Sequence, residues 1–134
     1  MIAKDYITED YVSFETARLL KEKGFDEECW CWYEEDGYFK DSNDDYGFQS
    51  NSDHISDDFI CSAPTLQMTM KWLREKYKLE IYPFHEKLQG DSWWYRIERS
   101  KAFFNITEYE EDLIFGSYEQ ACEAAIKYCL ENLI

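Results

Sequence analysis

One five-residue pattern, Ser, aromatic, Glu, any residue and Ala, occurs near each end of this 134-residue chain, at 13–17 and at 117–121. A serine hydroxyl accepts hydrogen bonds from the free N–H groups at a helix start, and an acid in the first turn interacts favourably with the helix dipole. The pattern predicts one helix from Ser13 to the stop signal Gly24, and another from Ser117 to the C-terminus. Any fold of this chain must therefore place a helix near each end.

A third helix is predicted in the middle of the chain, beginning near residues 62–65. Pro64 suits its first turn, where the missing N–H is not needed. Leu66, Met70 and Leu73 then recur at helical spacing, which indicates that one broad face is buried.

Strand patterns fill the intervals between these helices. A run of β-favouring residues at 29–33 leads through the turn Asp36-Gly37 to a short strand around Tyr38 and Phe39, which predicts a hairpin. After the central helix, residues 79–84 form a strand that Pro83 restricts to an edge or a terminus.

Two further strands are predicted before the last helix. Residues 93–98 alternate between their two faces, as in a sheet with one solvated face, and residues 102–107 are their hairpin partner. The order is then helix, two strands, helix, three strands and helix. It predicts a single α+β domain over residues 1–134, with an antiparallel or mixed sheet covered by about three helices.

Acidic residues are concentrated in the segment 26–58, which holds twelve of the 29 Asp and Glu residues, one base and seven aromatic residues. This segment contributes minus eleven to the net charge of minus fifteen. From Asp41 to Asp58 it shows no periodicity, which predicts an irregular acidic surface loop. Loops of this length are uncommon in compact domains and tend to be functional or disordered.

The strong negative charge argues against unaided binding to nucleic acid or to an anionic membrane, because phosphate binding depends on Lys and Arg. No apolar run approaches the length of a membrane span, and residues 1–11 lack the apolar core of a signal peptide. We therefore expect a cytoplasmic protein. Its five cysteines, odd in number and mostly within apolar runs, are typical of reduced core thiols.

Two weak metal-binding patterns occur in the acidic segment. Asp41, Asn43 and Asp45 place oxygen ligands at alternating positions, as a calcium loop does, but the required sixth-position Gly and twelfth-position Glu are replaced by Tyr46 and Ser52. Cys29 and Cys31 would share one face of a strand, where a packed core pair is the preferred interpretation. Adventitious cation binding by the loop stays open.

Catalytic signatures are missing from the sequence. It contains no Gly-rich phosphate loop, no Gly-x-Ser-x-Gly elbow and no His-Glu-x-x-His pattern. Acidic pairs are abundant, but so many acids produce adjacent pairs by composition alone. We therefore assign no catalytic residue and expect no cofactor.

Two segments carry a resemblance to a known group of proteins: residues 62–75, with Ala-Pro-Thr and Lys-Trp-Leu-Arg-Glu, and the C-terminal Ser-Tyr-Glu-Gln-Ala run at 117–126. They resemble small uncharacterised proteins carried by phages and prophages of gut bacteria. The resemblance covers about half of the chain and excludes the acidic loop. It implies a mobile-element origin and a helix-on-sheet fold of the phage α-β sandwich kind, and it carries no functional residues.

These observations favour a non-enzymatic accessory protein of phage or prophage origin that acts through protein contacts. Aromatic side chains supply binding energy and charges supply steering, so a basic or DNA-binding protein of the bacterial host is the expected partner. A homo-oligomer is left open. The candidate contact residues are Asp41, Asp44, Asp45, Tyr46, Phe48, Asp53, Asp57 and Asp58.

Two alternative functions stay open. One is an acidic DNA mimic that blocks a host DNA-binding protein, whose acidic face Glu108, Glu110, Glu111 and Asp112 would extend. The other is a hydrolase with a carboxylate-bound metal, which needs convergent acids in a cleft.

Overall fold

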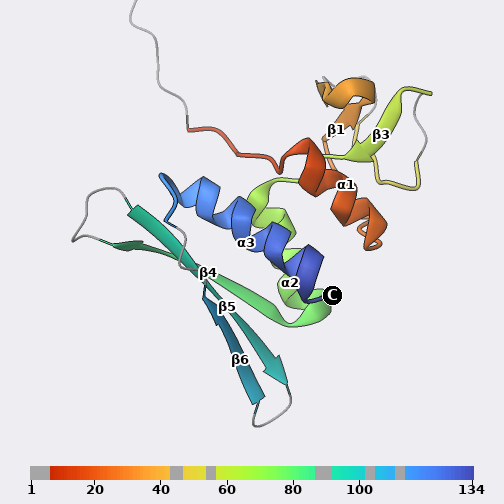
Figure 1. Ribbon diagram of the computed structural model, residues 1–134. Coiled ribbons are helices and arrows are strands. Elements are labelled where there is room, and N and C mark those ends of the chain that lie inside the picture. The colour runs from red at the N-terminus through yellow and green to blue at the C-terminus, as the bar shows by residue number, and fades with distance from the viewer. Residues whose placement is uncertain (1–6, 43–46, 54–56, 87–91, 102–104, 111–113) are drawn as a thin grey trace, which may run out of the picture.

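The computed structural model forms an α+β fold, as predicted, with helices packed between two small sheets (Figure 1). It describes residues 7–42, 47–53, 57–86, 92–101, 105–110 and 114–134, and only the backbone of residues 86, 100–101 and 105–110. Within these residues the chain contains three α-helices and two antiparallel sheets of three strands each. The mixed sheet that the sequence left open is therefore not formed there.

The first half of the chain contains one helix and the first sheet. In chain order these elements are α1 (Phe14–Glu22), β1 (Cys31–Glu34), the short 3-10 turn η1 (Glu35–Gly37), β2 (Phe39–Asp41) and β3 (Phe59–Ser62). The sheet order is β2-β1-β3, with all neighbours antiparallel. The predicted hairpin is confirmed, since Asp36 and Gly37 both adopt positive φ angles, 65° and 80°, in the turn between β1 and β2.

The second half contains the second sheet and two helices. These are α2 (Leu66–Tyr77), β4 (Leu79–Glu86), β5 (Ser92–Lys101), β6 (Asn105–Glu110) and α3 (Tyr118–Asn132). The sheet order is β4-β5-β6, so Pro83 lies in an edge strand, opposite Tyr95 of β5. An edge strand tolerates proline because its outer side has no ladder bond to lose.

The helix starts follow the predicted capping chemistry. The hydroxyl of Ser13 accepts from the N–H of Thr16 at 3.2 Å, and the hydroxyl of Ser117 accepts from the N–H of Gln120 at 3.1 Å. The first turn of α2 was predicted wrongly, because Thr65 caps this helix and Pro64 precedes the cap. The Pro64 carbonyl instead accepts from the backbone N–H of Val12, next to the antiparallel bridge between Tyr11 and Thr65.

The strand β3 is absent from the predicted order. Its four residues follow the acidic loop and are buried or half-buried on both faces, so they show none of the alternation that marks a strand with one wet face. Its pairing with β1 also joins residues far apart in sequence, such as Trp32 and Ser62. The order in the structure is therefore helix, three strands, helix, three strands and helix.

Despite that symmetrical order, the two halves are not copies of one unit. In the first sheet the first strand of the three is central, whereas in the second sheet the middle strand is central. The shared Ser-aromatic-Glu-x-Ala pattern therefore reflects similar capping chemistry at two unrelated helix starts.

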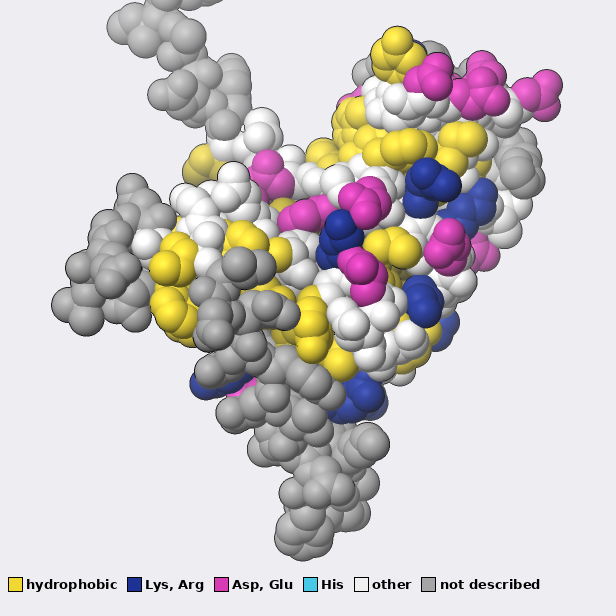
Figure 2. Space-filling view, viewed as in Figure 1, with side chains coloured by type: hydrophobic (Ala, Val, Ile, Leu, Met, Phe, Trp, Pro, Cys, Tyr) yellow, Lys and Arg dark blue, Asp and Glu magenta, His cyan; other side chains and the backbone are white. Residues whose placement is uncertain are grey.

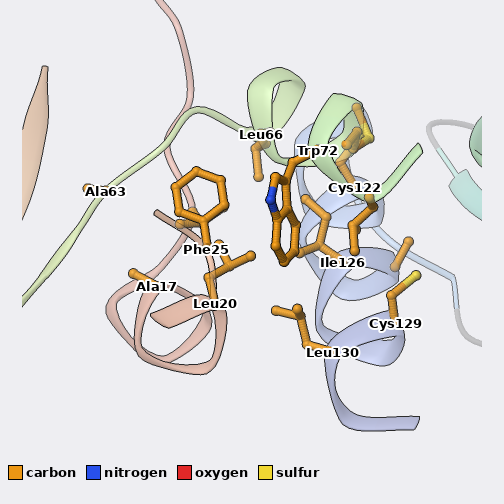
Figure 3. Packing of buried hydrophobic residues seen from close by; sticks show 14 of the residues in the cluster. Ala17, Leu20, Phe25, Ala63, Leu66, Trp72, Cys122, Ile126, Cys129 and Leu130 are labelled. Atoms are coloured by element: carbon orange, nitrogen blue, oxygen red, sulfur yellow. The ribbon is translucent and has the colours of Figure 1, made fainter. Parts of the chain in front are cut away.

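One buried hydrophobic cluster includes residues from both halves. Phe25, after α1, meets Trp72 of α2 edge to face with ring centroids 5.2 Å apart. In Figure 3 Leu20 of α1 lies next to Phe25, and Ile126 of α3 lies next to Trp72. Contacts of α3 with α1, α2, β4 and β5 place this helix at the centre of the molecule.

All five cysteines of the chain are buried and free, in agreement with the prediction of core thiols. Burial raises the pKa of Cys29 and Cys129 to about 12 and that of Cys61 and Cys122 to about 11. These thiols are therefore protonated at neutral pH and unreactive.

Candidate interaction surface

Residues 47–53, the central described part of the acidic loop, are held to the fold by hydrogen bonds. Gln49 and Cys29 exchange two backbone bonds of 2.8 Å each. The N–H of Ser52 donates to the Asp26 carboxylate at 2.7 Å, and this bond is the main reason that the pKa of Asp26 is lowered. This part of the loop is therefore a structural element as well as a carrier of charge.

Asn51 makes the most buried of these contacts. Its amide nitrogen donates to the Phe25 carbonyl at 2.6 Å, and its amide oxygen accepts from the Ser62 N–H at 2.8 Å. The side chain thereby joins the end of the α1 segment to β3, with 8% of the residue exposed. The loop supplies a polar residue to the interior, which composition alone did not indicate.

Four aromatic residues and one aspartate, which we call the acidic aromatic strip, link β2 to this loop. The strip consists of Phe39, Tyr11, Asp41, Trp30 and Phe48. The rings of Tyr11 and Phe39 are 5.0 Å apart, and those of Trp30 and Phe48 are 5.1 Å apart. Asp41 joins the two pairs, because it accepts from the Trp30 indole N–H at 2.8 Å and acts electrostatically on Tyr11.

The strip exposes aromatic surface that the fold does not cover. Phe48 is 59% exposed and Phe39 is 44% exposed, while Tyr11 and Trp30 are half-buried. Large exposed apolar side chains that lie together often mark an interaction site. Burial, with a smaller effect of Cys31 and nearby acids, raises the pKa of Tyr11 to about 12, so its phenol is neutral.

The charge around the strip is negative. In Figure 2 acidic side chains gather at the upper end of the molecule, over the end that holds β1 and β3 in Figure 1. Lys40, the one base of residues 26–58, lies 3.9 Å from the Glu34 carboxylate, so its charge is partly compensated. Glu9 adds a further negative charge near Tyr11.

Of the predicted contact residues that the structure describes, it brings together Asp41 and Phe48, through Trp30. Asp53 accepts from the N–H and hydroxyl of Ser50, at 2.9 and 3.0 Å, and so closes a local turn. Asp57 and Asp58 are exposed in the turn before β3. Asn43, Asp44, Asp45 and Tyr46 lie outside the described residues.

Three strip residues, Tyr11, Trp30 and Phe39, were not predicted as contact residues. Tyr11 is 28 positions from Phe39 in sequence, and long-range contacts of its segment, such as the bridge between Tyr11 and Thr65, hold it in place. For Phe39 a signal existed, since the Asp36-Gly37 turn predicts the hairpin whose second strand carries it.

A second group of exposed aromatics lies on the face of β4 and β5 opposite to the buried residues of that sheet. Phe84 is 39% exposed and stacks on Trp94 with centroids 6.1 Å apart. The Arg96 guanidinium lies over the Tyr82 ring at 5.3 Å. Unlike the strip, this group includes a cation, and it provides an internal comparison for experiments.

The described part of the chain contains no cluster of side chains suited to bind a metal ion. No three His, Cys, Asp or Glu side chains there could hold an ion together. Of the weak candidates, Asp41 is engaged by the Trp30 indole, and Asn43 and Asp45 lie outside the described residues. The side chains of Glu108 and Glu110 also lie outside them, as do Glu111 and Asp112, so the DNA-mimic alternative stays a prediction.

Among the described residues no helix is both long and apolar enough to span a bilayer. Comparisons with protein-family models, with curated proteins and with solved structures found no match to this chain.

Proposed function

We propose that this chain is a non-enzymatic accessory protein of phage or prophage origin, and that it binds a basic protein of the bacterial host through the acidic aromatic strip. The observation that carries the proposal is the contact of exposed Phe48 with Trp30, whose indole N–H is held by the Asp41 carboxylate. Such a site offers aromatic surface to bury and negative charge to attract a cationic partner.

The surroundings of the strip support a basic partner over a neutral or acidic one. Residues 26–58 carry minus eleven, and an acidic partner would meet repulsion at every approach. Electrostatic attraction raises the association rate and weakens with added salt, whereas the aromatic contact sets how long the complex lasts. A location in the host cytoplasm, where such partners occur, belongs to the same proposal.

The test begins with capture of partners from a lysate of a gut bacterium at low salt, followed by calorimetry with each purified partner. We expect Phe48→Ala to weaken binding about tenfold or more, as removal of a central aromatic anchor does. The matched control is Phe84→Ala, which removes an exposed phenylalanine from the other sheet and should leave the affinity unchanged.

A second variant separates charge from packing. Asp41→Asn removes the charge and keeps an oxygen that can accept from the Trp30 indole. We expect it to slow association and to reduce the dependence of binding on salt, with little change in the dissociation rate. The proposal fails if no captured protein is basic, or if Phe84→Ala weakens binding as much as Phe48→Ala.

A further inference from the structure

Two adjoining hollows form a groove between the N-terminal segment and the starts of α2 and α3. They measure about 380 and 240 Å³ and share Asp10, Leu66 and Glu119. The larger one extends over Ala124 towards Lys127, and the smaller one over Gln67 and Tyr118. We call this the N-terminal groove.

The polar groups around the middle of the groove are already bonded within the protein. The Leu66 N–H donates to the Asp10 carbonyl at 2.9 Å, and the Gln67 amide donates to the Tyr118 hydroxyl at 2.9 Å. The remaining surface of the larger hollow is mainly apolar and includes Ala124 and Tyr11. A ligand would therefore gain contact there chiefly by burying apolar groups.

The charge of the groove is negative. Of the described residues that line it, four are acids, Glu9, Asp10, Glu119 and Glu123, and one is a base, Lys127. The ammonium of Lys127 lies 2.9 Å from Glu15 and 3.9 Å from Glu131, two acids that do not line the groove. Lys127 is thus compensated mainly by acids outside the groove, with a smaller effect of Glu123, and the described carboxylates of the groove remain in excess.

Glu123 adds a specific acceptor. One of its carboxylate oxygens accepts from the Ser13 N–H at 3.0 Å. The other is buried and has no hydrogen-bond partner among the described residues. Its negative charge is therefore not fully compensated by hydrogen bonds, and it favours a cation in the larger hollow, which Glu123 lines.

We infer that the N-terminal groove binds a short segment of another protein that carries a Lys or Arg beside a leucine-sized apolar side chain. The apolar side chain occupies the hollow over Ala124 and Leu66, and the cation meets Glu119 and Glu123. The acidic lining disfavours an anionic ligand, and its apolar part disfavours a purely polar cation. This inference does not rest on the partner proposed for the strip.

The test is a methyl NMR titration of the full chain, labelled at Ala and Leu methyl groups, with the peptide acetyl-Lys-Leu-Lys-Leu-Lys-amide. We expect saturable shifts of the Ala124 and Leu66 signals at submillimolar peptide. Glu119→Lys, which changes an exposed residue, should weaken the binding at least tenfold. Phe48→Ala should leave it unchanged, which separates this site from the strip.

Two further peptides show which chemistry the groove recognises. Acetyl-Lys-Gly-Lys-Gly-Lys-amide and acetyl-Glu-Leu-Glu-Leu-Glu-amide should each bind at least tenfold more weakly than the Lys-Leu peptide. Equal shifts with the Lys-Gly peptide would show charge attraction alone and overturn the inference. So would unshifted Ala124 and Leu66 signals, or the same shifts on concentrating the protein without peptide, which would indicate a second copy in the groove.

Discussion

At the scale of single residues, removal of the Asn51 side chain should destabilise the fold strongly. Its amide donates to the Phe25 carbonyl and accepts from the Ser62 N–H, and both bonds are buried. We expect Asn51→Ala to lower the free energy of unfolding by about 2 to 4 kcal/mol, because each unsatisfied backbone group costs about 1 to 3 kcal/mol. Urea denaturation followed by circular dichroism measures the change.

The exposed Asn132 provides the control for this substitution. Its amide donates to the Tyr128 carbonyl on the surface of α3. Asn132→Ala should cost less than about 0.5 kcal/mol, as most surface substitutions do. Similar losses for both variants would show that Asn51 is not a structural bridge.

The buried thiols predict a decline of stability at alkaline pH. Burial raises the pKa of Cys29 and Cys129 from 9.0 to about 12, so in this range the unfolded chain loses protons that the folded chain keeps. The stabilisation is complete below pH 9 and is lost as the pH rises towards 12. Urea unfolding at pH 8, 9, 10 and 10.5 should show a falling free energy.

The double variant Cys29→Ala and Cys129→Ala separates the contribution of the thiols from that of tyrosines such as Tyr11, whose pKa is also raised to about 12. Removing two titrating groups should make the fall between pH 9 and 10.5 shallower, even though the variant is less stable at pH 8. An unchanged slope would mean that the thiols are not the source of the dependence.

At the scale of elements, the β1–β2 hairpin requires glycine at position 37 of its turn. Gly37 has a φ of 80°, and an added Cβ would lie 3.1 Å from the Phe14 ring. We expect Gly37→Ala to cost about 1 to 3 kcal/mol, from backbone strain and from displacement of that ring. Thermal unfolding monitored by circular dichroism is the measurement.

Gly47 is a matched control that measures the cost of backbone strain without a side-chain contact. Its φ is 66°, and no atom of the described residues lies within 4 Å of an added Cβ. Gly47→Ala should therefore cost only the strain of the left-handed conformation, about 1 kcal/mol. If it destabilised the protein more than Gly37→Ala did, contact with Phe14 would not be the cause.

Apart from the Thr65 cap of α2, elements that depend on neighbours in sequence were predicted, whereas the strand that depends on a distant partner was not. The caps at Ser13 and Ser117 and the turn at Asp36-Gly37 are local, and all three are in the structure. The strand β3 exists because β1 pairs with it across the acidic loop, and no local pattern reports that pairing.

The residues of the acidic aromatic strip also divide into those that the sequence predicted and those that it did not. Asp41 and Phe48 were found because acids and aromatics are concentrated around them. Tyr11 and Trp30 were missed, since their place in the strip depends on contacts made by folding, such as the bridge from Tyr11 to Thr65 and the Trp30 indole bond. Exposure is a property of packing, and composition predicts it only on average.

At the scale of the molecule, the contact between Phe25 and Trp72 links the two halves of the core. We expect Trp72→Ala to lower the unfolding free energy by about 3 to 5 kcal/mol, the usual cost of truncating a buried tryptophan. Tryptophan fluorescence and far-ultraviolet circular dichroism should still report one shared urea transition for the variant. Two separate transitions would show that the halves unfold independently.

The position of Pro83 in the edge strand β4 limits how copies of this protein can associate. A strand from another chain that aligned with β4 would need hydrogen-bond donors along the free edge, and proline supplies none. Growth of the second sheet from one molecule into the next is therefore interrupted at the middle of this edge. Pro83 would therefore protect the β4 edge from fibre formation at high protein concentration, without any change in the net charge.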